Sequence, residues 1–442
     1  MALGLTPHQI IEKGIHPQLV IADEWERVEL KKIASVQNGY AFSSKLFNRT
    51  EGMPLIRIRD IFSVETENLY LGEYKEDFVV NKGDILIGMD GDFKVSKWPG
   101  NKGLLNQRVC RIHFDSNHYD KEFLFICIQP YLNAIHSETS AVTVKHLSSR
   151  TINDIPFPLP PLPEQRAIVA KIEELFSDLD KGIADLKKAQ DQLKIYRQSV
   201  LSSSFPKKEL MELSKLVPSL SQGWSPKCIN QNSSDETQWA VIKTSAIQAG
   251  RFVDFENKIL PKSLEPREQH EIKKGDILIT RAGPRVRVGI CCLVRNTRPR
   301  LINCDKVYRL ILDRDQVDGE YFEYVMNSPE ILSEIEVMKS GTSDSGLNLT
   351  QKAFLKLRIP YVPLDQQRQI VLEIESRLSV CDKVEQSINE SLDKAKALRQ
   401  SILKKALEGT LLSEEELSAC KAAKDYEPAS VLLKKIKAEK KK

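Results

Sequence analysis

Two stretches of the chain concentrate positive side chains and contain no acidic residue. From Phe93 to Phe114 there are five cations, and from Ile277 to Cys304 there are six arginines. In each copy the chain leaves a β-rich run and enters a glycine-containing loop, at 88–91 or 283–284, that brings in these cations. Lysine and arginine side chains on such loops contact the phosphates and base edges of nucleic acids. A solubilising loop would explain one such stretch, but its occurrence twice favours binding to a polyanion.

A second kind of loop combines Gly, an aromatic residue, Ser and Lys, and it also occurs twice, at 38–45 and 221–227. Such a loop can pack on the globule and offer hydrogen-bond donors to DNA. A turn with Tyr40 and Phe42 in the core explains the same residues equally well. The candidate DNA-binding residues of the chain are Tyr40, Ser43, Ser44, Lys45, Lys94, Lys97, Asn106, Gln107, Arg108, Trp224, Lys227, Lys243, Arg281, Arg285, Arg287 and Arg295.

Patterns that carry catalysis are scarce. The chain has no P-loop, no Gly-x-Gly-x-x-Gly and no Asp-Pro-Pro-Tyr tetrapeptide. Its eight cysteines form no Cys-x-x-Cys pair, and neither His113 nor His118 has a partner at metal-ligand spacing. We therefore expect no catalytic residue and no metal site. Asp254 with Glu271 and Lys273 could mimic a nuclease metal site, so an autonomous metal-dependent DNA endonuclease is the alternative hypothesis. A coiled-coil scaffold without DNA contact is a third.

The chain repeats itself. The hexapeptide Lys-Gly-Asp-Ile-Leu-Ile stands at 82–87 and again at 274–279. Residues 162–169 align without gaps with 364–371, and the same offset of 202 positions relates 197–201 to 399–403. Such self-similarity indicates a tandem duplication of about 200 residues, in which each copy ends in the same segment.

The repeated end segment has the heptad pattern of a long helix. Apolar residues stand at Ile168, Leu175, Ala189 and Tyr196 and at Ile172, Leu179, Leu186, Leu193 and Val200 in the first copy, and at Ile370, Val384 and Leu398 and at Ile374, Cys381, Ile388, Ala395 and Ile402 in the second. We predict that the two helices form an antiparallel coiled coil. The proline-rich run at 156–161 predicts a stiff polyproline lead-in to the first helix.

The segments before each helix show short β-rich runs separated by Gly, Asn, Pro and Ser, which predicts an α+β globule in each copy. The predicted organisation is a globular domain at 1–155, a helix at 156–204, a second globular domain at 205–360, a second helix at 361–410 and a tail with a helix at 411–442.

A membrane location is not expected. The longest apolar run, Phe123–Ile128, is far shorter than the roughly 20 residues that span a bilayer. Residues 1–12 lack the basic start and long apolar run of a secretory signal. We therefore predict a cytoplasmic protein.

The alternation of globule and helix resembles the specificity (S) subunits of type I restriction-modification systems. The resemblance covers nearly the whole chain and is carried by 161–169 and 363–371, which open the two helices, and by the residues at 39–44, 83–91, 105–109, 223–227 and 427–430. The second copy departs from the pattern in two places. It has Asp365 where the first copy has Pro163, and it has 303–306 in place of Asn106-Gln107-Arg108.

The resemblance implies two target recognition domains that each bind half of a bipartite double-stranded DNA site. It implies that the helices act as a spacer and as a docking surface for two methyltransferase (M) subunits, which bind S-adenosylmethionine and methylate adenine at N6. Restriction (R) subunits would add ATP- and magnesium-dependent translocation and cleavage. The chain itself would bind no cofactor and would not be an enzyme.

Overall fold

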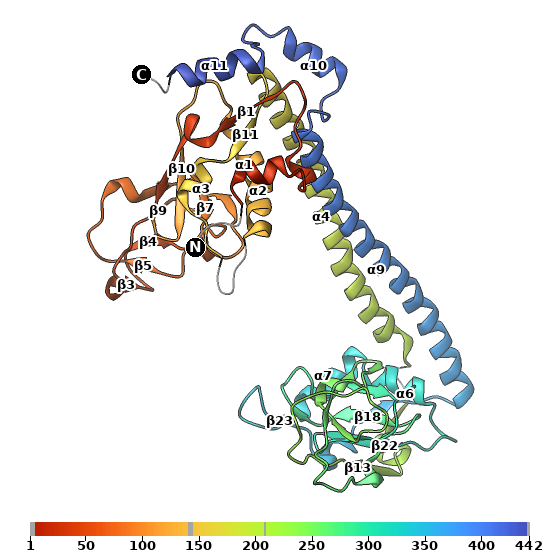
Figure 1. Ribbon diagram of the computed structural model, residues 1–442. Helices are drawn as coiled ribbons and strands as arrows, with labels where there is room; N and C mark the ends of the chain where they lie inside the picture. Colours follow the sequence, from red (N-terminus) through yellow and green to blue (C-terminus); the bar gives the residue numbers. More distant parts are fainter. Residues whose placement is uncertain (1–4, 140–144, 207–208, 440–442) are drawn as a thin grey trace. The chain divides into compact units, whose positions relative to one another are not determined.

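The computed structural model describes residues 5–139, 145–206 and 209–439. The chain divides into two compact units. Unit 1 comprises Met1–Ala184 and Leu392–Lys442, and unit 2 comprises Asp185–Ser391. Two long helices, α4 (Leu162–Ser204) and α9 (Leu364–Leu407), each contribute residues to both units (Figure 1).

Unit 1 contains eleven strands within its described residues and five helices besides the long pair. The strands are β1 (Glu26–Glu29), β2 (Ala34–Asn38), β3 (Phe47–Asn48), β4 (Met53–Ile56), β5 (Leu69–Tyr70), β6 (Val79–Asn81), β7 (Ile85–Gly88), β8 (Val95–Lys97), β9 (Lys102–Leu105), β10 (Val109–Phe114) and β11 (Pro156–Leu159). The helices are α1 (Pro7–Glu12), α2 (Lys121–Glu138), α3 (Ser149–Asn153), α10 (Glu414–Lys421) and α11 (Ala429–Glu439).

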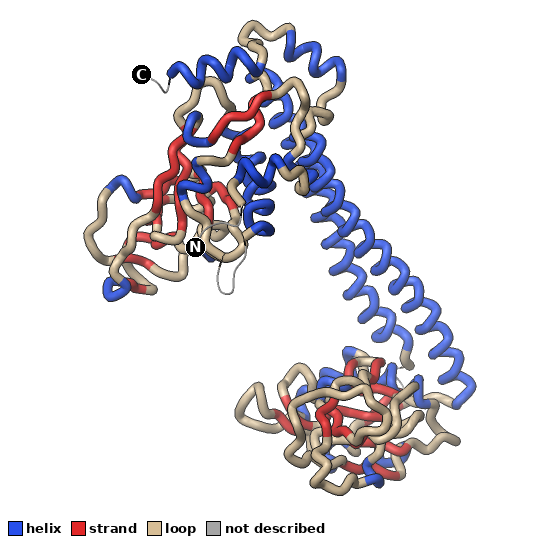
Figure 2. The backbone as a smooth tube through the Cα atoms, viewed as in Figure 1, coloured by secondary structure: helices blue, strands red, loops and turns tan. Residues whose placement is uncertain are grey.

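Unit 2 has the corresponding mixture of elements, and in both units the strands lie together with short helices around them (Figure 2). The strands are β12 (Leu210–Glu212), β13 (Ser219–Gln222), β14 (Ala240–Ile242), β15 (Ile247–Gln248), β16 (Arg251–Phe252), β17 (Asn257–Ile259), β18 (Ile277–Thr280), β19 (Ala282–Gly283), β20 (Cys291–Leu293), β21 (Leu301–Ile302), β22 (Val307–Ile311), β23 (Leu347–Asn348) and β24 (Arg358–Pro360). The helices are α5 (Leu213–Leu216), α6 (Gly319–Met326), α7 (Pro329–Met338) and α8 (Gln351–Phe354).

The sheets confirm the predicted duplication and the α+β fold. A four-stranded sheet with the order β2-β10-β7-β8 in unit 1 has its counterpart in β13-β22-β18-β20 of unit 2. A parallel pair, β4 with β9, corresponds to β14 with β21. An antiparallel ribbon, β1 with β11, corresponds to β12 with β24.

The repeated hexapeptide builds the same turn in each copy. Its glycines, Gly83 and Gly275, have φ angles of +86° and +94°, a backbone region that favours glycine. The carboxylate of Asp84 accepts a hydrogen bond from the Asn81 amide at 2.9 Å, and Asp276 accepts one from Lys273 at 2.8 Å. These motifs therefore have a structural role, which is to enter the buried central strands β7 and β18.

The prediction of a polyproline lead-in at 156–161 was wrong for its first four residues. Pro156–Leu159 form strand β11, which pairs antiparallel with β1 and is buried throughout. Proline lacks an amide hydrogen but tolerates extended backbone at the edge of a sheet. Burial of Phe157 and Leu159, both 0% exposed, favours the strand.

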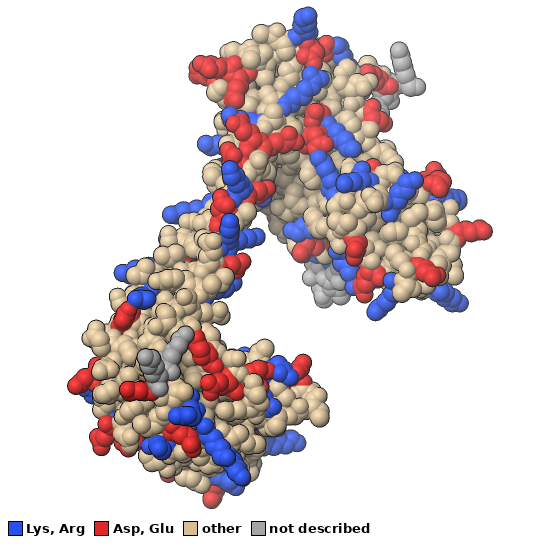
Figure 3. All heavy atoms as spheres, turned by 180° about the vertical axis from the view of Figure 1, so that it is seen from behind, with Lys and Arg blue, Asp and Glu red and all other residues tan. Residues whose placement is uncertain are grey.

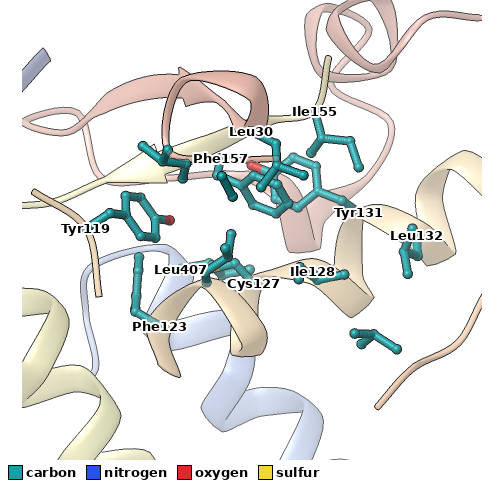
Figure 4. Close-up of a cluster of buried hydrophobic side chains, with 14 of the residues drawn as sticks. Leu30, Tyr119, Phe123, Cys127, Ile128, Tyr131, Leu132, Ile155, Phe157 and Leu407 are labelled. Carbon is teal, nitrogen blue, oxygen red and sulfur yellow. The ribbon is translucent and has the colours of Figure 1, made fainter. Parts of the chain in front are cut away.

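The core of unit 1 joins parts of the chain that lie far apart in sequence. In Figure 4, Phe123, Cys127 and Tyr131 of α2 lie in one cluster with Phe157 of β11. Leu407, at the end of α9, belongs to the same cluster. Unit 2 has an equivalent core between its central sheet and α6, in which Tyr321 and Phe322 are both 0% exposed.

Each long helix is fixed to its globule by a buried glutamine. The side-chain oxygen of Gln165 accepts a hydrogen bond from the amide of Asp120 at 2.7 Å, and its NH₂ group donates to the Pro160 carbonyl at 2.8 Å. Asp120 is the N-cap of α2, so one side chain connects the start of α4 to the start of a globule helix.

Gln367 forms the same clamp at the start of α9. It accepts from the amide of Asp318, the N-cap of α6, at 2.8 Å and donates to the Val362 carbonyl at 2.7 Å. Both glutamines are 0% exposed. The repeated sequence that opens the helices is therefore explained by this connection between helix and globule.

The antiparallel packing of α4 and α9 is confirmed. Gln190 donates to Asn389 at 3.4 Å, and Arg197 lies 2.7 Å from Asp382. In unit 1, Arg399 lies 3.2 Å from Asp180. The residue numbers rise along α4 as their partners' numbers fall along α9.

In one of the two predicted apolar rows, three residues were wrong, whereas Ile168 of the same row is buried. Tyr196, Val384 and Leu398 are 49%, 42% and 50% exposed, whereas the following residues include Arg197 and Arg399, which pair with the other helix. The other predicted row is confirmed in α9, where Ile374, Cys381 and Ile388 are at most 6% exposed. Arg197 and Arg399 face the partner helix because each pairs with an aspartate on it. The residues that precede them, Tyr196 and Leu398, are exposed to solvent instead.

The tail contains the predicted helix as α11, preceded by a further helix, α10. The Ser413 hydroxyl accepts a hydrogen bond from the Glu416 amide, and the Glu416 side chain accepts one from the Ser413 amide, which forms a capping box at the start of α10. Leu432 and Ile436 of α11 are buried in the core of unit 1. Among the described residues, none of the helices has the length and hydropathy that crossing a membrane requires.

Candidate nucleic-acid interface

The site begins with a glycine that lets two backbones touch. A Cβ atom on Gly39 would lie 2.0 Å from the Asn106 carbonyl oxygen, and one on Gly223 would lie 1.9 Å from that of Asn303. In unit 1 the next amide, that of Tyr40, donates to the Leu105 carbonyl at 2.9 Å. In unit 2 the Trp224 amide donates to the Asn303 carbonyl at the same distance. Each glycine therefore fixes its aromatic loop against the end of a strand, at β9 in unit 1 and after β21 in unit 2.

In unit 1 this arrangement borders an open pocket of about 500 Å³. It is lined by Phe42, Ser44, Phe47, Arg57, Ile58, Arg59, Asn106, Gln107 and Arg108. The three arginines provide positive charge, and Asn106 and Gln107 provide amides. Arg108 is held 3.2 Å from Asp90, which also accepts from His146 at 2.6 Å.

In unit 2 an open pocket of about 510 Å³ has the same framework. It is lined by Ser225, Pro226, Lys227, Cys228, Val241, Ile242, Lys243, Thr244, Lys258, Cys304, Asp305 and Lys306. The lining includes four lysines and one carboxylate, Asp305. Burial raises the pKa of the Cys304 thiol to about 11, so this cysteine is protonated at neutral pH.

The pockets stand at equivalent places in the two copies. Each is lined by the loop after the glycine, by the turn that follows a strand of the parallel pair, and by the turn after the other strand. Arg57 and Lys243 each stand immediately before a short 3-10 turn, after β4 and β14 respectively. A basic pocket at a strand end can accept a nucleic-acid backbone and leave the amides free to contact bases.

The structure brings together six of the predicted residues in these pockets. They are Ser44, Asn106, Gln107 and Arg108 in unit 1, and Lys227 and Lys243 in unit 2. Arg57 and Arg59 also line the pocket of unit 1, and neither was predicted. The signal was available, because Arg57 follows the β-rich run at 54–56 as Lys243 follows the run at 240–242.

The two predicted aromatic residues lie beside the pockets. Tyr40 is 52% exposed, and its ring lies 5.1 Å from that of Phe42 and 5.2 Å from that of Phe78. Trp224 is partly buried, and the Arg267 guanidinium lies 4.5 Å from its ring. Phe42 is 8% exposed, so the interpretation of this residue as core is confirmed.

Three predicted cations are paired with acids away from the pockets. Lys97 pairs with Glu122 of α2. Arg295 lies 2.8 Å from Glu323 of α6. Arg285 lies 2.8 Å from Asp344 and pairs with Glu336 of α7.

The two stretches contain no acidic residues, but acidic side chains from helices later in the chain pair with their cations. Figure 3 shows acidic and basic side chains interspersed on the face that it displays. Absence of acidic residues in a stretch therefore did not predict a free positive surface.

The remaining predicted residues lie on the surface of their units. Ser43, Lys45 and Lys94 are exposed, and Arg287 is partly exposed. Arg281 borders the pocket of unit 2, where its Nε donates to the Asp305 carbonyl at 2.7 Å. Their contact with DNA stays a prediction.

The alternative of a metal-dependent nuclease is not supported. Across residues 5–139, 145–206 and 209–439, no group of three or more His, Cys, Asp or Glu side chains is arranged to hold a metal ion. Glu271 instead accepts a hydrogen bond from the Arg300 amide at 2.6 Å. The eight cysteines are free, and all but Cys228 are buried.

Comparison with known proteins identifies the family. Residues 22–188 match the type I restriction modification DNA specificity domain. The chain is 31% identical to the specificity subunit of the type I restriction enzyme EcoBI from Escherichia coli, over 99% of this chain and 97% of that protein. It is 26% identical to the EcoKI specificity subunit of Escherichia coli strain K12, over 70% of this chain and 69% of that protein.

Solved structures share the fold. One solved structure describes complex assembly and conformational transition of the type I R-M system. A chain in it has a TM-score of 0.65 and 19% identity, over 88% of this chain and 99% of that chain. The HsdS subunit from Thermoanaerobacter tengcongensis has a TM-score of 0.50 at 19% identity, over 88% and 98%. With a relative similar over almost its entire length and the duplicated architecture in agreement, the chain belongs to the family of type I restriction enzyme specificity subunits.

Proposed function

We propose that this chain is the DNA-recognition subunit of a type I restriction-modification complex, and that each copy binds one half of a bipartite target. The observation that carries the proposal is the pair of basic pockets at equivalent strand ends. A duplicated protein with one such pocket per copy is suited to a DNA site read in two separate parts.

The charge of the pockets supports double-stranded DNA as the ligand. Arg57 in unit 1 and Lys306 in unit 2 are placed to neutralise phosphates. Arg108 and Lys243 also line the pockets but lie 3.2 Å from Asp90 and 3.7 Å from Glu256. Binding that releases counterions from phosphates falls steeply as salt concentration rises. The amides and the carboxylate in the pockets supply the hydrogen bonds that distinguish bases.

The chain is proposed to act with partner subunits and to perform no catalysis itself. Two M subunits would dock on the chain, bind S-adenosylmethionine and methylate adenine at N6. R subunits would use ATP and magnesium for translocation and cleavage. We propose a cytoplasmic location, where the target DNA and these subunits are found together, and no cofactor bound by this chain.

The test is co-purification of the chain with the products of neighbouring genes, followed by methylome sequencing of cells that express the complex. We expect a bipartite motif with an unread spacer. Exchange of residues 1–155 for those of another family member is expected to change one half of the motif and leave the other intact. A motif altered in both halves, or methylation without a motif, would contradict the proposal.

A further inference from the structure

The turns that line the two pockets differ in chemistry at two positions. Asn106 and Cys304 are 8% and 5% exposed, whereas the residues that follow them, Gln107 and Asp305, are the more accessible pair. Each is the second residue of a tight turn. The Val109 amide donates to the Asn106 carbonyl at 2.9 Å, and Val307 donates to Cys304 at 3.2 Å. The two positions are therefore structurally equivalent.

Neighbouring elements hold the two turns in the same way. The Met89 amide donates to the Arg108 carbonyl at 3.0 Å, and the Arg281 amide donates to the Lys306 carbonyl at 2.9 Å. The residues that follow 107 and 305 are thus held by neighbouring strands in both copies. In unit 2 the Ser225 hydroxyl also accepts from the Asp305 amide at 3.1 Å and donates to its carboxylate, and asparagine keeps an oxygen that can accept this bond.

Two of the positions around this one carry a cation in both copies. Arg57 corresponds to Lys243, and Arg108 corresponds to Lys306. Cations that are present in both copies suit the sequence-independent contact with phosphates. The change from amide to carboxylate at 107 and 305 is a change in hydrogen-bonding pattern, which is what distinguishes one base edge from another.

Asp305 is a carboxylate within a pocket that has four lysines. A carboxylate repels phosphate, so it does not add to the affinity for the DNA backbone. One of its oxygens accepts from the Ser225 hydroxyl. The other has no hydrogen-bond partner among the described residues, and the side chain is partly exposed. An acceptor that is free at a DNA-facing turn can receive a hydrogen bond from a base.

We propose that Asp305 and Gln107 read one base each in the two halves of the target. Asp305 accepts a hydrogen bond from an exocyclic amino group in the major groove, N4 of cytosine or N6 of adenine. Gln107 is exposed and pairs with an adenine edge, donating to N7 and accepting from N6. The inference rests on the proposed function, and it names the residues that set part of the specificity.

The test uses the complete complex with Asp305→Asn in the full chain. Asparagine keeps the shape and one acceptor but adds donors, so thymine O4 and guanine O6 become acceptable partners. We expect the preference at one base pair of the second half-site to fall by roughly 5- to 150-fold, and the first half-site to remain unchanged. Gln107→Glu is expected to alter one position of the first half-site only. Binding to a randomised DNA library, together with methylome sequencing, measures both.

A matched control is Asp315→Asn, which removes an exposed carboxylate of unit 2 outside the pocket and is expected to leave the motif intact. The inference is overturned if D305N methylates the unchanged motif. It is also overturned if D305N lowers affinity for every sequence equally, with the thermal unfolding of the complex measured alongside. A wild-type complex that yields no motif would instead refute the proposed function, so the two failures are distinguishable.

Discussion

The guanidinium of Arg197 in α4 lies 2.7 Å from the carboxylate of Asp382 in α9. Arg399 and Asp180, the residues related to them by the offset of 202 positions, form an ion pair of their own at 3.2 Å. In each pair, one copy supplies the arginine and the other supplies the aspartate. The duplication therefore produces a helix pair in which each copy contributes one arginine and one aspartate to the ion pairs between the helices.

These two ion pairs between the helices are each expected to have a small coupling energy that is independent of the other. Both pairs are partly exposed, and such ion pairs contribute about 0.2–1 kcal/mol. A double-mutant cycle with Arg197→Ala and Asp382→Ala is expected to give a value in this range. Because the two pairs share no residue, adding Arg399→Ala is expected to be additive within about 0.5 kcal/mol. Urea unfolding of the full chain measures the energies, and a coupling above this range would indicate a buried network.

The glutamine clamps predict a larger effect. Gln165→Leu leaves the Asp120 amide and the Pro160 carbonyl without their partners in a buried place, which costs about 2–4 kcal/mol. Gln367→Leu is expected to lower the free energy of unfolding of unit 2 by a similar amount. The control is Gln198→Leu, on the exposed surface of α4. Hydrogen exchange at the start of α2 should increase in Q165L only, and equal exchange in both variants would contradict the clamp.

The glycines at the pockets predict loss of structure and of DNA binding together. A Cβ on Gly39 or Gly223 would overlap a backbone carbonyl, so alanine forces the loop away from the strand end. We expect G39A and G223A to lower the melting temperature and to weaken DNA affinity. Gly182→Ala is the opposite case, because its Cβ meets nothing within 4 Å and alanine favours a helix by about 1 kcal/mol. A stable G39A that binds DNA normally would refute the close-contact argument.

A buried carboxylate predicts a dependence of stability on pH. Burial raises the pKa of Glu164 above its ordinary value of 4.5, an effect that the hydrogen bond from Trp25 partly offsets. The folded chain then holds this proton more tightly than the unfolded chain, so the free energy of unfolding falls as pH rises from 4.5 through the folded pKa.

Glu164→Gln is expected to remove this part of the pH dependence and to keep an acceptor for Trp25. Gln366 already occupies the corresponding position of the second helix. Chemical unfolding at pH 5 and pH 8 measures the difference, with the exposed Glu173→Gln as control. An unchanged difference in E164Q would show that Glu164 does not contribute to it.

The predicted cations differ in their contribution to DNA binding. Arg57→Ala is expected to reduce the magnitude of the salt dependence of log Kd by about one, as one phosphate contact is lost. Arg295→Ala is expected to leave it unchanged, because Glu320 and Glu323 already neutralise this side chain. Filter binding at several salt concentrations measures the slopes. Equal slopes for the two variants would indicate that Arg295 contacts a phosphate as Arg57 does.

Repetition in the sequence was enough to predict the duplicated architecture and its two long helices, since the 162–169 and 364–371 segments and the heptads are local patterns that indicate helices. The strand at Pro156–Leu159 was not predictable in this way, because its partner β1 lies about 130 positions earlier. The pockets were found in part. Asn106 and Lys243 were named, but Arg57 was not, because it lies beside Asn106 only when β4 and β9 pair in unit 1. Charge balance was the weakest predictor, since Arg285 and Arg295 are neutralised by acids of helices that lie later in the chain.

The discontinuity of unit 1 has a consequence for synthesis. Unit 2 is one uninterrupted segment, so all its residues have been made before translation reaches Leu392. The core of unit 1 lacks Leu407, Leu432 and Ile436 until the last part of the chain leaves the ribosome. The core of the domain that is translated first therefore cannot be complete before residues of the second copy have been made, and until then its apolar surface is exposed to aggregation.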